Sequence, residues 1–247
     1  VNLTLALQAA GARIGLLDAD IYGPSQALML GVQGQRPETP DGKSFNPVIA
    51  HGIPVMSMAF LLTERSPTIW RGPMVSGAFT QMLRQTNWGN LDYLVIDLPP
   101  GTGDIQLTLS QQVPVNGAVV VTTPQDIALL DARRGIEMFR RVEVPVLGVI
   151  ENMSLHRCSK CGHTEHLFGE GGGDRIAAEY DTELLGALPL DLSIRQQTDI
   201  GKPSVISDPD GVIAQSYRDI ARRTAARLAL FAEHNGSSNL ITKIQGT

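Results

Sequence analysis

Short apolar runs, rich in β-branched residues and leucine, recur along the chain between polar and glycine-containing segments. Unbroken apolar runs of this length are typical of strands that are buried on both faces of a parallel sheet. The sequence therefore predicts buried parallel strands at 14–17, 93–96, 118–121, 146–150 and 184–188.

The segments between these runs have the character of helices. We predict helices at 73–87, 104–112, 125–142 and 172–180. Strands that alternate with helices imply right-handed crossovers, which cover both faces of a sheet with helices. The predicted fold class is therefore α/β, with a doubly wound and mostly parallel sheet.

Both ends of the chain extend this pattern. Residues 1–10 and 211–231 carry apolar side chains at helical spacing, and we predict a first and a closing helix there. Residues 36–46 are rich in proline, glycine and polar side chains, which is typical of a surface loop. We expect a single domain over 1–234 and a flexible tail over 235–247.

Composition and charge narrow the classes of protein. The chain has 247 residues, of which 43% are hydrophobic, so it can bury a substantial core in one domain. Its formal net charge is -5 and no stretch combines clustered Lys and Arg with aromatics, so we expect no nucleic-acid partner. No apolar run approaches the ~20 residues of a membrane span, and the first residues lack the features of a signal peptide. We therefore expect no membrane partner and a cytoplasmic location.

Two carboxylates follow the first predicted strand. Asp18 and Asp20 stand in the sequence D-A-D-I-Y-G-P-S, at the carboxyl end of a parallel strand, where open α/β sheets bind their ligands. Mg²⁺ and an attacking water would lie at this position. The alternative is structural, because both carboxylates could shape a turn and cap a helix that opens at Pro24.

A third carboxylate ends the second predicted strand. The apolar strand at 93–96 runs into Asp97, which is the Walker-B pattern for holding Mg²⁺ through water. A stiff, glycine-jointed loop, P-P-G-T-G-D over 99–104, follows this acid and could sense a γ-phosphate. A simple turn capped by Thr102 or Asp104 would explain the loop but not the acid in front of it.

Two further strand ends, T-T-P-Q-D over 122–126 and E-N-M over 151–153, complete a candidate pocket for a purine nucleotide. Asn152 follows the strand at 146–150, and its amide can both donate to and accept from a purine edge. Pro189 follows the strand at 184–188 and could contribute a flat wall. Each signal is weak alone, because an asparagine at a strand end more often closes a turn than it binds a base.

The chain contains only two cysteines, Cys158 and Cys161, as a C-x-x-C pair in a loop over about 152–173. Two cysteines are too few for a disulfide framework, and this spacing in a reducing compartment indicates metal or redox chemistry. A thioredoxin-like redox pair would normally begin a helix, where the helix dipole lowers the thiol pKa. The glycine-flanked loop does not fit that arrangement.

Two metal-binding interpretations stay open for this pair. A structural zinc ion could use both cysteines together with His156 and His163, which makes four ligands from one chain. A four-iron cluster typically takes four thiolates, whereas one chain offers two. A two-fold homodimer that places two such loops face to face would supply all four.

Several motifs occur together in this chain: D-A-D-I-Y-G-P-S, W-R-G-P-M, D-L-P-P-G-T-G-D, T-T-P-Q-D, and E-N-M-S followed by C-x-x-C-G-H. Together they resemble the Mrp/ApbC family of iron-sulfur carrier ATPases, from Val1 to about Ser207. That family belongs to the deviant-Walker P-loop group with MinD and ParA. The resemblance implies a P-loop NTPase-like fold with ATP and Mg²⁺. It also implies a 4Fe-4S cluster, held between the subunits of a homodimer and delivered to apo iron-sulfur proteins.

The resemblance implies roles for single residues. Asp18 and Asp20 match the family's first switch, in which Asp20 places the hydrolytic water. Asp97 matches the Walker-B acid, and Asn152 matches the adenine-side residue. The family's phosphate loop, of the form G-K-G-G-V-G-K-S, ends a few residues before the position that matches Val1. No G-x-x-x-x-G-K-S/T pattern occurs in the 247 residues, so we expect this chain to lack its own phosphate cradle.

Other functions on the same fold remain as alternatives. A nitrogenase-iron-protein-like electron donor also bridges a cluster between subunits, but its ligands come from separated loops, unlike Cys158 and Cys161. A MinD- or ParA-like positioning ATPase needs a basic amphipathic tail or a basic face, whereas the tail after Asn235 carries only Lys243 as a basic residue. The third alternative is a zinc-stabilised scaffold without a cluster.

Overall fold

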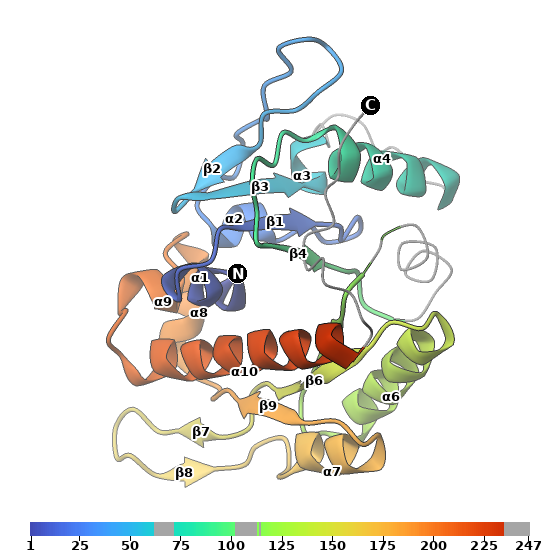
Figure 1. Cartoon of the computed structure of the whole chain (residues 1–247). Coiled ribbons are helices and arrows are strands. Elements are labelled where there is room, and N and C mark those ends of the chain that lie inside the picture. Colours follow the sequence, from blue (N-terminus) through green and yellow to red (C-terminus); the bar gives the residue numbers. More distant parts are fainter. Residues whose placement is uncertain (62–71, 102–112, 114, 235–247) are drawn as a thin grey trace.

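The computed structural model describes residues 1–61, 72–101, 113 and 115–234 (Figure 1). The helix predicted at 104–112 lies outside these described residues. So do the end of the P-P-G-T-G-D loop, the first two residues of the W-R-G-P-M motif, and the predicted tail.

The first half of the chain forms a four-stranded sheet with the order β2-β3-β1-β4. Its strands are β1 (Ile14–Asp18), β2 (Val48–Ala50), β3 (Ile53–Ser57) and β4 (Tyr93–Asp97). β1 pairs in parallel with both β3 and β4, while β2 is antiparallel to β3. The structure confirms the strands predicted at 14–17 and 93–96, and it adds β2 and β3, which were not predicted.

The second half forms a three-stranded parallel sheet with the order β5-β6-β9. Its strands are β5 (Ala118–Thr122), β6 (Val146–Glu151) and β9 (Leu184–Ala187), and all of them were predicted. β7 (His156–Arg157) and β8 (Thr164–Glu165) form a separate antiparallel pair, which was not predicted.

Five helices overlap the predicted ones: α1 (Asn2–Ala9), α4 (Gly72–Gln85), α6 (Asp126–Arg141), α7 (Gly172–Glu179) and α10 (Val212–His234). The structure adds α2 (Gln26–Met29), α3 (Met58–Leu61), α8 (Leu192–Asp199) and α9 (Ser204–Ser207), which were not predicted. No helix within the described residues is both long and apolar enough to cross a membrane.

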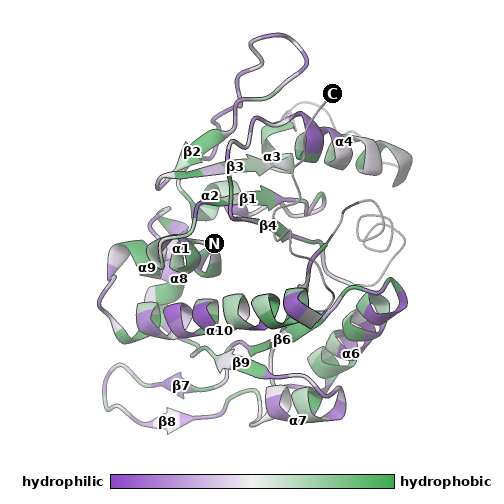
Figure 2. Cartoon of the chain, viewed as in Figure 1, coloured by the Kyte–Doolittle hydropathy of each residue, from purple (hydrophilic) through white to green (hydrophobic). Residues whose placement is uncertain are grey.

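Helices cover both faces of the strands, as the predicted α/β class requires. Neighbouring residues of β1 point to opposite sides, so that Leu16 packs with α1 and α10, and Leu17 packs with α4. In the second sheet, Val149 packs with α6 and α7, whereas Ile150 packs with α10. Figure 2 accordingly shows mainly hydrophobic strands in these two sheets and helices of mixed character around them, whereas β7 and β8 are hydrophilic.

Apart from the β7–β8 pair, the described strands form two hydrogen-bonded sets, where the sequence predicted one sheet. β4 ends the first set and β5 begins the second, and within the described residues neither strand has a partner on its outer edge. Both strands are apolar but only partly buried, and Val121 of β5 is 60% exposed. Such edges can accept a further strand.

Gly148 tests how closely β6 and β9 pack. A Cβ atom on Gly148 would lie 2.6 Å from the backbone oxygen of Glu183 and 2.6 Å from Leu185 Cγ. A Cβ atom on Gly135 in α6 would meet nothing within 4 Å. We expect Gly148→Ala to lower the free energy of unfolding in urea by about 1–3 kcal/mol, because the backbone must shift. Gly135→Ala should raise it by about 0.5–1 kcal/mol. Equal effects would contradict the packing of β6 on β9.

Candidate functional site

The carboxylates predicted at the first two strand ends lie side by side. β1 and β4 are parallel neighbours, and their register pairs Asp18 with Asp97, the last residue of each strand. Ser57, the last residue of β3, is paired with Asp18 from the other side. Because parallel strands present their carboxyl ends at one edge, these three polar side chains meet there.

Asp18 is fully buried and accepts hydrogen bonds from Ser57, Gln26 and Asp20. The Ser57 hydroxyl donates to Oδ2 at 2.8 Å, and the backbone N–H of Gln26 donates to the same oxygen at 3.2 Å. The backbone N–H of Asp20 donates to Oδ1 at 3.2 Å. Gln26 is the first residue of α2, so Asp18 also stabilises the start of this short helix.

The burial of these acids changes their protonation. Burial is the main cause that raises the pKa of Asp18 to about 6; the charge of Asp97 adds to it, while the hydrogen bond from Ser57 opposes it. Burial also raises the pKa of Asp97, against the opposing effects of the chain's amino terminus and of Gln26. Asp18 is buried and Asp97 is partly buried. A divalent cation beside these two carboxylates would favour their charged forms.

In this structure the side chain of Asp20 accepts hydrogen bonds from the backbone of its own loop. Its Oδ1 accepts hydrogen bonds from the backbone N–H groups of Tyr22 at 3.0 Å and Gly23 at 3.1 Å. This turn, together with the contacts of Asp18, shows the turn-forming role that the sequence left open. The cation and water roles of the two residues stay predictions.

Sequence analysis missed Gln26, which connects the two buried acids. Its side-chain Nε2 donates to Asp97 Oδ2 at 2.7 Å, and its backbone N–H donates to Asp18. Its Oε1 accepts a hydrogen bond from the amino group of Val1 at 3.3 Å. In the sequence, the only signal for Gln26 is its position directly after D-A-D-I-Y-G-P-S. Its contact with Asp97, 71 positions away, forms only when the chain folds.

Asn152 and Pro189 lie at the carboxyl end of the second sheet: Asn152 directly follows β6, and Pro189 follows β9 after Leu188. The backbone N–H of Asn152 donates to the oxygen of Thr122 at 2.7 Å. The side-chain Oδ1 of Asn152 accepts from the N–H of Met153 at 3.0 Å, and Met153 has a φ of 55°. This oxygen therefore closes a turn, and a role of Asn152 and Pro189 toward a purine stays a prediction.

The two cysteines lie in the turn of a β-hairpin, where the sequence predicted a loop. The backbone N–H of Cys158 donates to the oxygen of His163 at 2.8 Å, beside the pairing of β7 with β8. The N–H of Gly162 donates to the oxygen of Cys158 at 2.9 Å, and Gly162 has a φ of 73°, which favours glycine. Cys158 is half-buried, Cys161 is exposed, and both are free thiols.

The same turn favours the ionised form of Cys158. The backbone N–H groups of Cys161 and Lys160, followed by the Cys161 side chain, lower the pKa of the Cys158 thiol. Burial and the charge of Glu165 oppose this shift. The thiolate is the form of cysteine that binds metals, and a role of Cys158 as a metal ligand stays a prediction.

The zinc site considered from the sequence is not assembled. Among the described residues, no three His, Cys, Asp or Glu side chains are grouped so that they could hold a metal ion. His156 bonds through Nδ1 to the oxygen of Leu190 at 3.1 Å, and His166 bonds through Nδ1 to the oxygen of Ser154 at 2.8 Å. His163 likewise does not join the cysteines in such a group. The described residues of one chain therefore offer two thiol ligands for a metal. A metal that needs more ligands must take the others from outside these residues.

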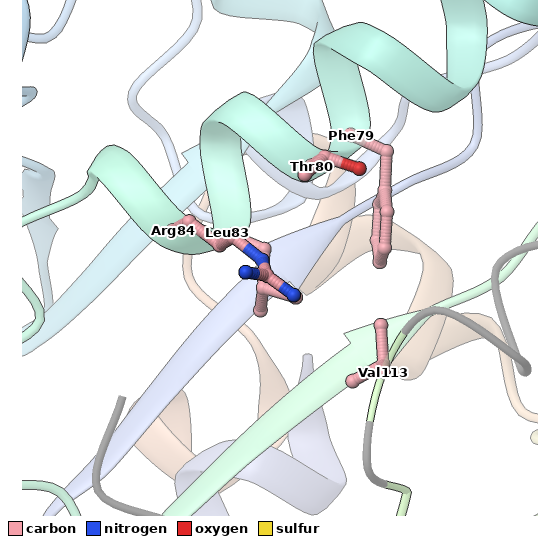
Figure 3. A pocket seen from close by; sticks show the side chains of 5 residues that line it. All are labelled: Phe79, Thr80, Leu83, Arg84 and Val113. Carbon is pink, nitrogen blue, oxygen red and sulfur yellow. The ribbon is translucent and has the colours of Figure 1, made fainter. Parts of the chain in front are cut away.

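A cavity of about 270 Å³ is separate from these groups (Figure 3). Its walls are formed by Phe79, Thr80, Leu83, Arg84 and Val113, the first four of which belong to α4. None of the predicted site residues lines it, so the cavity is not part of the candidate site.

The chain is similar to a family of iron-transfer NTPases and to iron-sulfur cluster carrier proteins. The family model described as "ParA: NUBPL iron-transfer P-loop NTPase" matches residues 1–225. The chain is 62% identical over 221 residues to the iron-sulfur cluster carrier protein of Pseudomonas fragi, a match that covers 89% of this chain and 77% of that protein. It is 58% identical over 228 residues to the iron-sulfur cluster carrier protein of Escherichia coli K12, covering 92% of this chain but only 62% of that protein's length.

Solved structures are similar in fold. A nucleotide-binding protein from Archaeoglobus fulgidus, solved in complex with ADP, matches with a TM-score of 0.73 and 33% identity, over 87% of this chain and 82% of that one. The cell division ATPase MinD from Pyrococcus furiosus matches with a TM-score of 0.65, over 91% of this chain and 90% of that one. Its identity is 19%, so this second likeness concerns the fold alone.

The raised pKa of Asp18 predicts that the free energy of unfolding depends on pH. Its pKa in the folded chain, about 6, lies above the usual range of an aspartate in an unfolded chain, ~3.9. A carboxyl group whose pKa rises on folding stabilises the fold fully below the unfolded value, and this contribution is lost as the pH rises through the folded value. Without divalent cations, we expect the free energy of unfolding to fall between about pH 4 and about pH 6 through Asp18.

Asp18→Asn should remove this part of the slope in urea unfolding. Asp41→Asn is the control, because backbone N–H donation from Ser44 and Lys43 lowers the pKa of Asp41 to about 2. The contribution of Asp41 is therefore lost only as the pH falls below about 4, outside the tested window. A slope that is unchanged in Asp18→Asn would contradict the assignment.

Proposed function

Because the chain belongs to the NUBPL iron-transfer P-loop NTPase family, we propose that it is an iron-sulfur cluster carrier. In this proposal a 4Fe-4S cluster binds between two copies of the chain and passes to apo iron-sulfur proteins. The observation that carries the proposal is the hairpin, which presents Cys158 and Cys161 as free thiols without further metal ligands from the described residues. The names of the relatives from P. fragi and E. coli support it.

Two thiolates from each chain suit a cluster that must be released. A four-iron cluster takes four thiolates, and two hairpins related by a two-fold axis supply them. Cys161 is exposed, so thiolates of an acceptor can replace the carrier's thiolates one at a time without a change of oxidation state. Free thiols persist in a reducing compartment, which supports the cytoplasm as the place of action.

The nucleotide part of the proposal is ATP hydrolysis with Mg²⁺. Bound Mg²⁺ would neutralise charge on the phosphates. Asp97 is the acid that would hold it through water, with the buried carboxylate of Asp18 beside it. Asp20 would orient the attacking water. The amide of Asn152 uses its oxygen in a turn, which leaves its Nδ2 for a purine acceptor, and Pro189 would form a wall beside it.

Hydrolysis also needs backbone N–H groups and a lysine around the phosphates, and the 247 residues contain no G-x-x-x-x-G-K-S/T pattern. The edges of β4 and β5, which have no partner strand among the described residues, support a place for a strand that carries such a loop. A strand that pairs in parallel with either edge would bring the loop that follows it to the same end of the sheets as Asp97.

Loss of either cysteine tests the cluster site. We expect Cys158→Ala and Cys161→Ala each to lose the iron and sulfide that the wild type binds after anaerobic reconstitution. Ser159→Ala in the same turn is the control and should bind as the wild type does. Since the hairpin lies outside the core, all three should unfold in urea within about 0.5 kcal/mol of the wild type. Retention of the brown cluster absorbance by either cysteine variant would refute the site.

Substitution of Asp97 and of Asp20 tests the nucleotide site. In the chain preceded by a phosphate-binding strand and loop, Asp97→Asn and Asp20→Asn should lower ATP turnover by about a hundredfold or more. The reason is that one carboxylate holds the cation and the other orients water. Asp92→Asn is the matched control, since Asp92 precedes the same strand but forms an exposed ion pair with Arg13. Wild-type turnover in the Asp97 or Asp20 variant would exclude that residue's role.

A further inference from the structure

The segment that carries the two cysteines leaves the second sheet after β6 and returns to the fold at α7 (Figure 1). Glu151, the last residue of β6, meets Gly173, the second residue of α7, at the base of this segment. The backbone N–H of Gly173 donates to Glu151 Oε2 at 2.6 Å. One hydrogen bond thus joins two positions that are 22 residues apart in sequence.

This contact is buried and closely packed. Glu151 is only 5% exposed. A Cβ atom on Gly173 would lie 3.0 Å from Glu151 Cβ and 2.8 Å from Leu184 Cδ1. A Cβ atom on Gly172 would lie 2.8 Å from Pro124 Cα. A side chain at either glycine would push α7 away from the ends of β5 and β6, so the close approach depends on glycine.

The carboxylate also completes the first turn of α7. The N-cap residue of this helix is Gly171, which has no side chain that could accept a hydrogen bond. Glu151 supplies the acceptor from β6, and its negative charge lies at the positive end of the helix dipole. Hydrogen bonds to an ionised carboxylate are about twice as strong as neutral ones. Glu151 therefore makes a strong internal contact at this point.

Two further contacts lie nearer the cysteines. The ring of His166 bonds through Nδ1 to the oxygen of Ser154, and the N–H of Ser154 donates to the oxygen of Leu188 at 2.9 Å. Glu151 adds the charged contact where the segment joins the sheet. The outgoing and returning parts of the segment are therefore held together at its base.

We infer that Glu151 is a positioning residue for the cysteine hairpin. It does not touch the thiols; it holds both ends of their segment on the sheet end that carries Asn152. Asn152 follows Glu151 directly and is bonded to Thr122, so the cysteine segment and the predicted purine side share one base. The consequence rests on the proposed function: a shift at Asn152 on nucleotide binding moves the base and changes how firmly the thiols hold the cluster.

Hydrogen exchange of the full, metal-free chain tests the positioning role. In Glu151→Ala, we expect amides of the hairpin and of the first turn of α7 to exchange roughly tenfold faster than in the wild type. Glu151→Gln should lie between them, because its amide oxygen still accepts, and it keeps the test valid if the alanine variant does not fold. The control is Arg133→Ala, which removes the ion pair with Glu179 (2.9 Å) at the other end of α7.

A merely structural role would raise hairpin exchange in every variant in proportion to its loss of global stability, measured by urea unfolding. A positioning role raises it at the hairpin base in the Glu151 variants and leaves it unchanged in Arg133→Ala. Hairpin exchange at the wild-type rate in both Glu151 variants overturns the inference.

Cluster retention tests the consequence. The same proteins are loaded with iron and sulfide without oxygen and then exposed to EDTA. Glu151→Ala should load but lose iron roughly tenfold faster than the wild type, with Glu151→Gln between them. If the wild type binds no cluster, the proposed function fails, while the exchange measurement still decides the role of Glu151. Equal rates of iron loss in the wild type and Glu151→Ala contradict the link to the cluster.

Discussion

β1 and β4 run in the same direction and in register, so Asp18 and Asp97 must lie next to each other where both strands end. The same parallel pairing in the second sheet brings the end of β6 beside that of β5, so that Asn152 bonds to Thr122. β1 is buried and β4 is partly buried, so both acids lose hydration and their pKa values rise. Strand direction therefore determines where these acids lie, and burial determines how their pKa values shift.

The cysteine hairpin extends from the same end of the second sheet, and its properties differ from those of the strand ends. Its thiols are accessible, its turn favours the thiolate of Cys158, and the described residues add no further metal ligand. Its base, in contrast, is held by the buried contact of Glu151 with Gly173. This combination fits a protein that binds a cluster and then gives it up. Release needs thiols that an acceptor can reach, and binding needs thiols that are held in a fixed arrangement.

Much of the fold was predictable because unbroken apolar runs identify buried parallel strands. β3 was missed because Pro54 interrupts its apolar pattern, and β2 because it has only three residues. α2 has four residues and depends on tertiary contacts such as that of Asp18 with Gln26. The candidate site was predictable by residue type at strand ends. The contacts of Gln26 and Glu151 were not predicted, since their partners are 71 and 22 positions away and only the folded chain brings them together.

The central claim is that two chains hold one iron-sulfur cluster through their C-x-x-C pairs. The most direct test is the iron, sulfide and zinc content of the protein purified without oxygen, together with the mass of the assembly in solution. The account predicts about four irons and four sulfides for each pair of chains, and a dimer whose formation depends on the cluster. One zinc ion per chain, without sulfide, would contradict it.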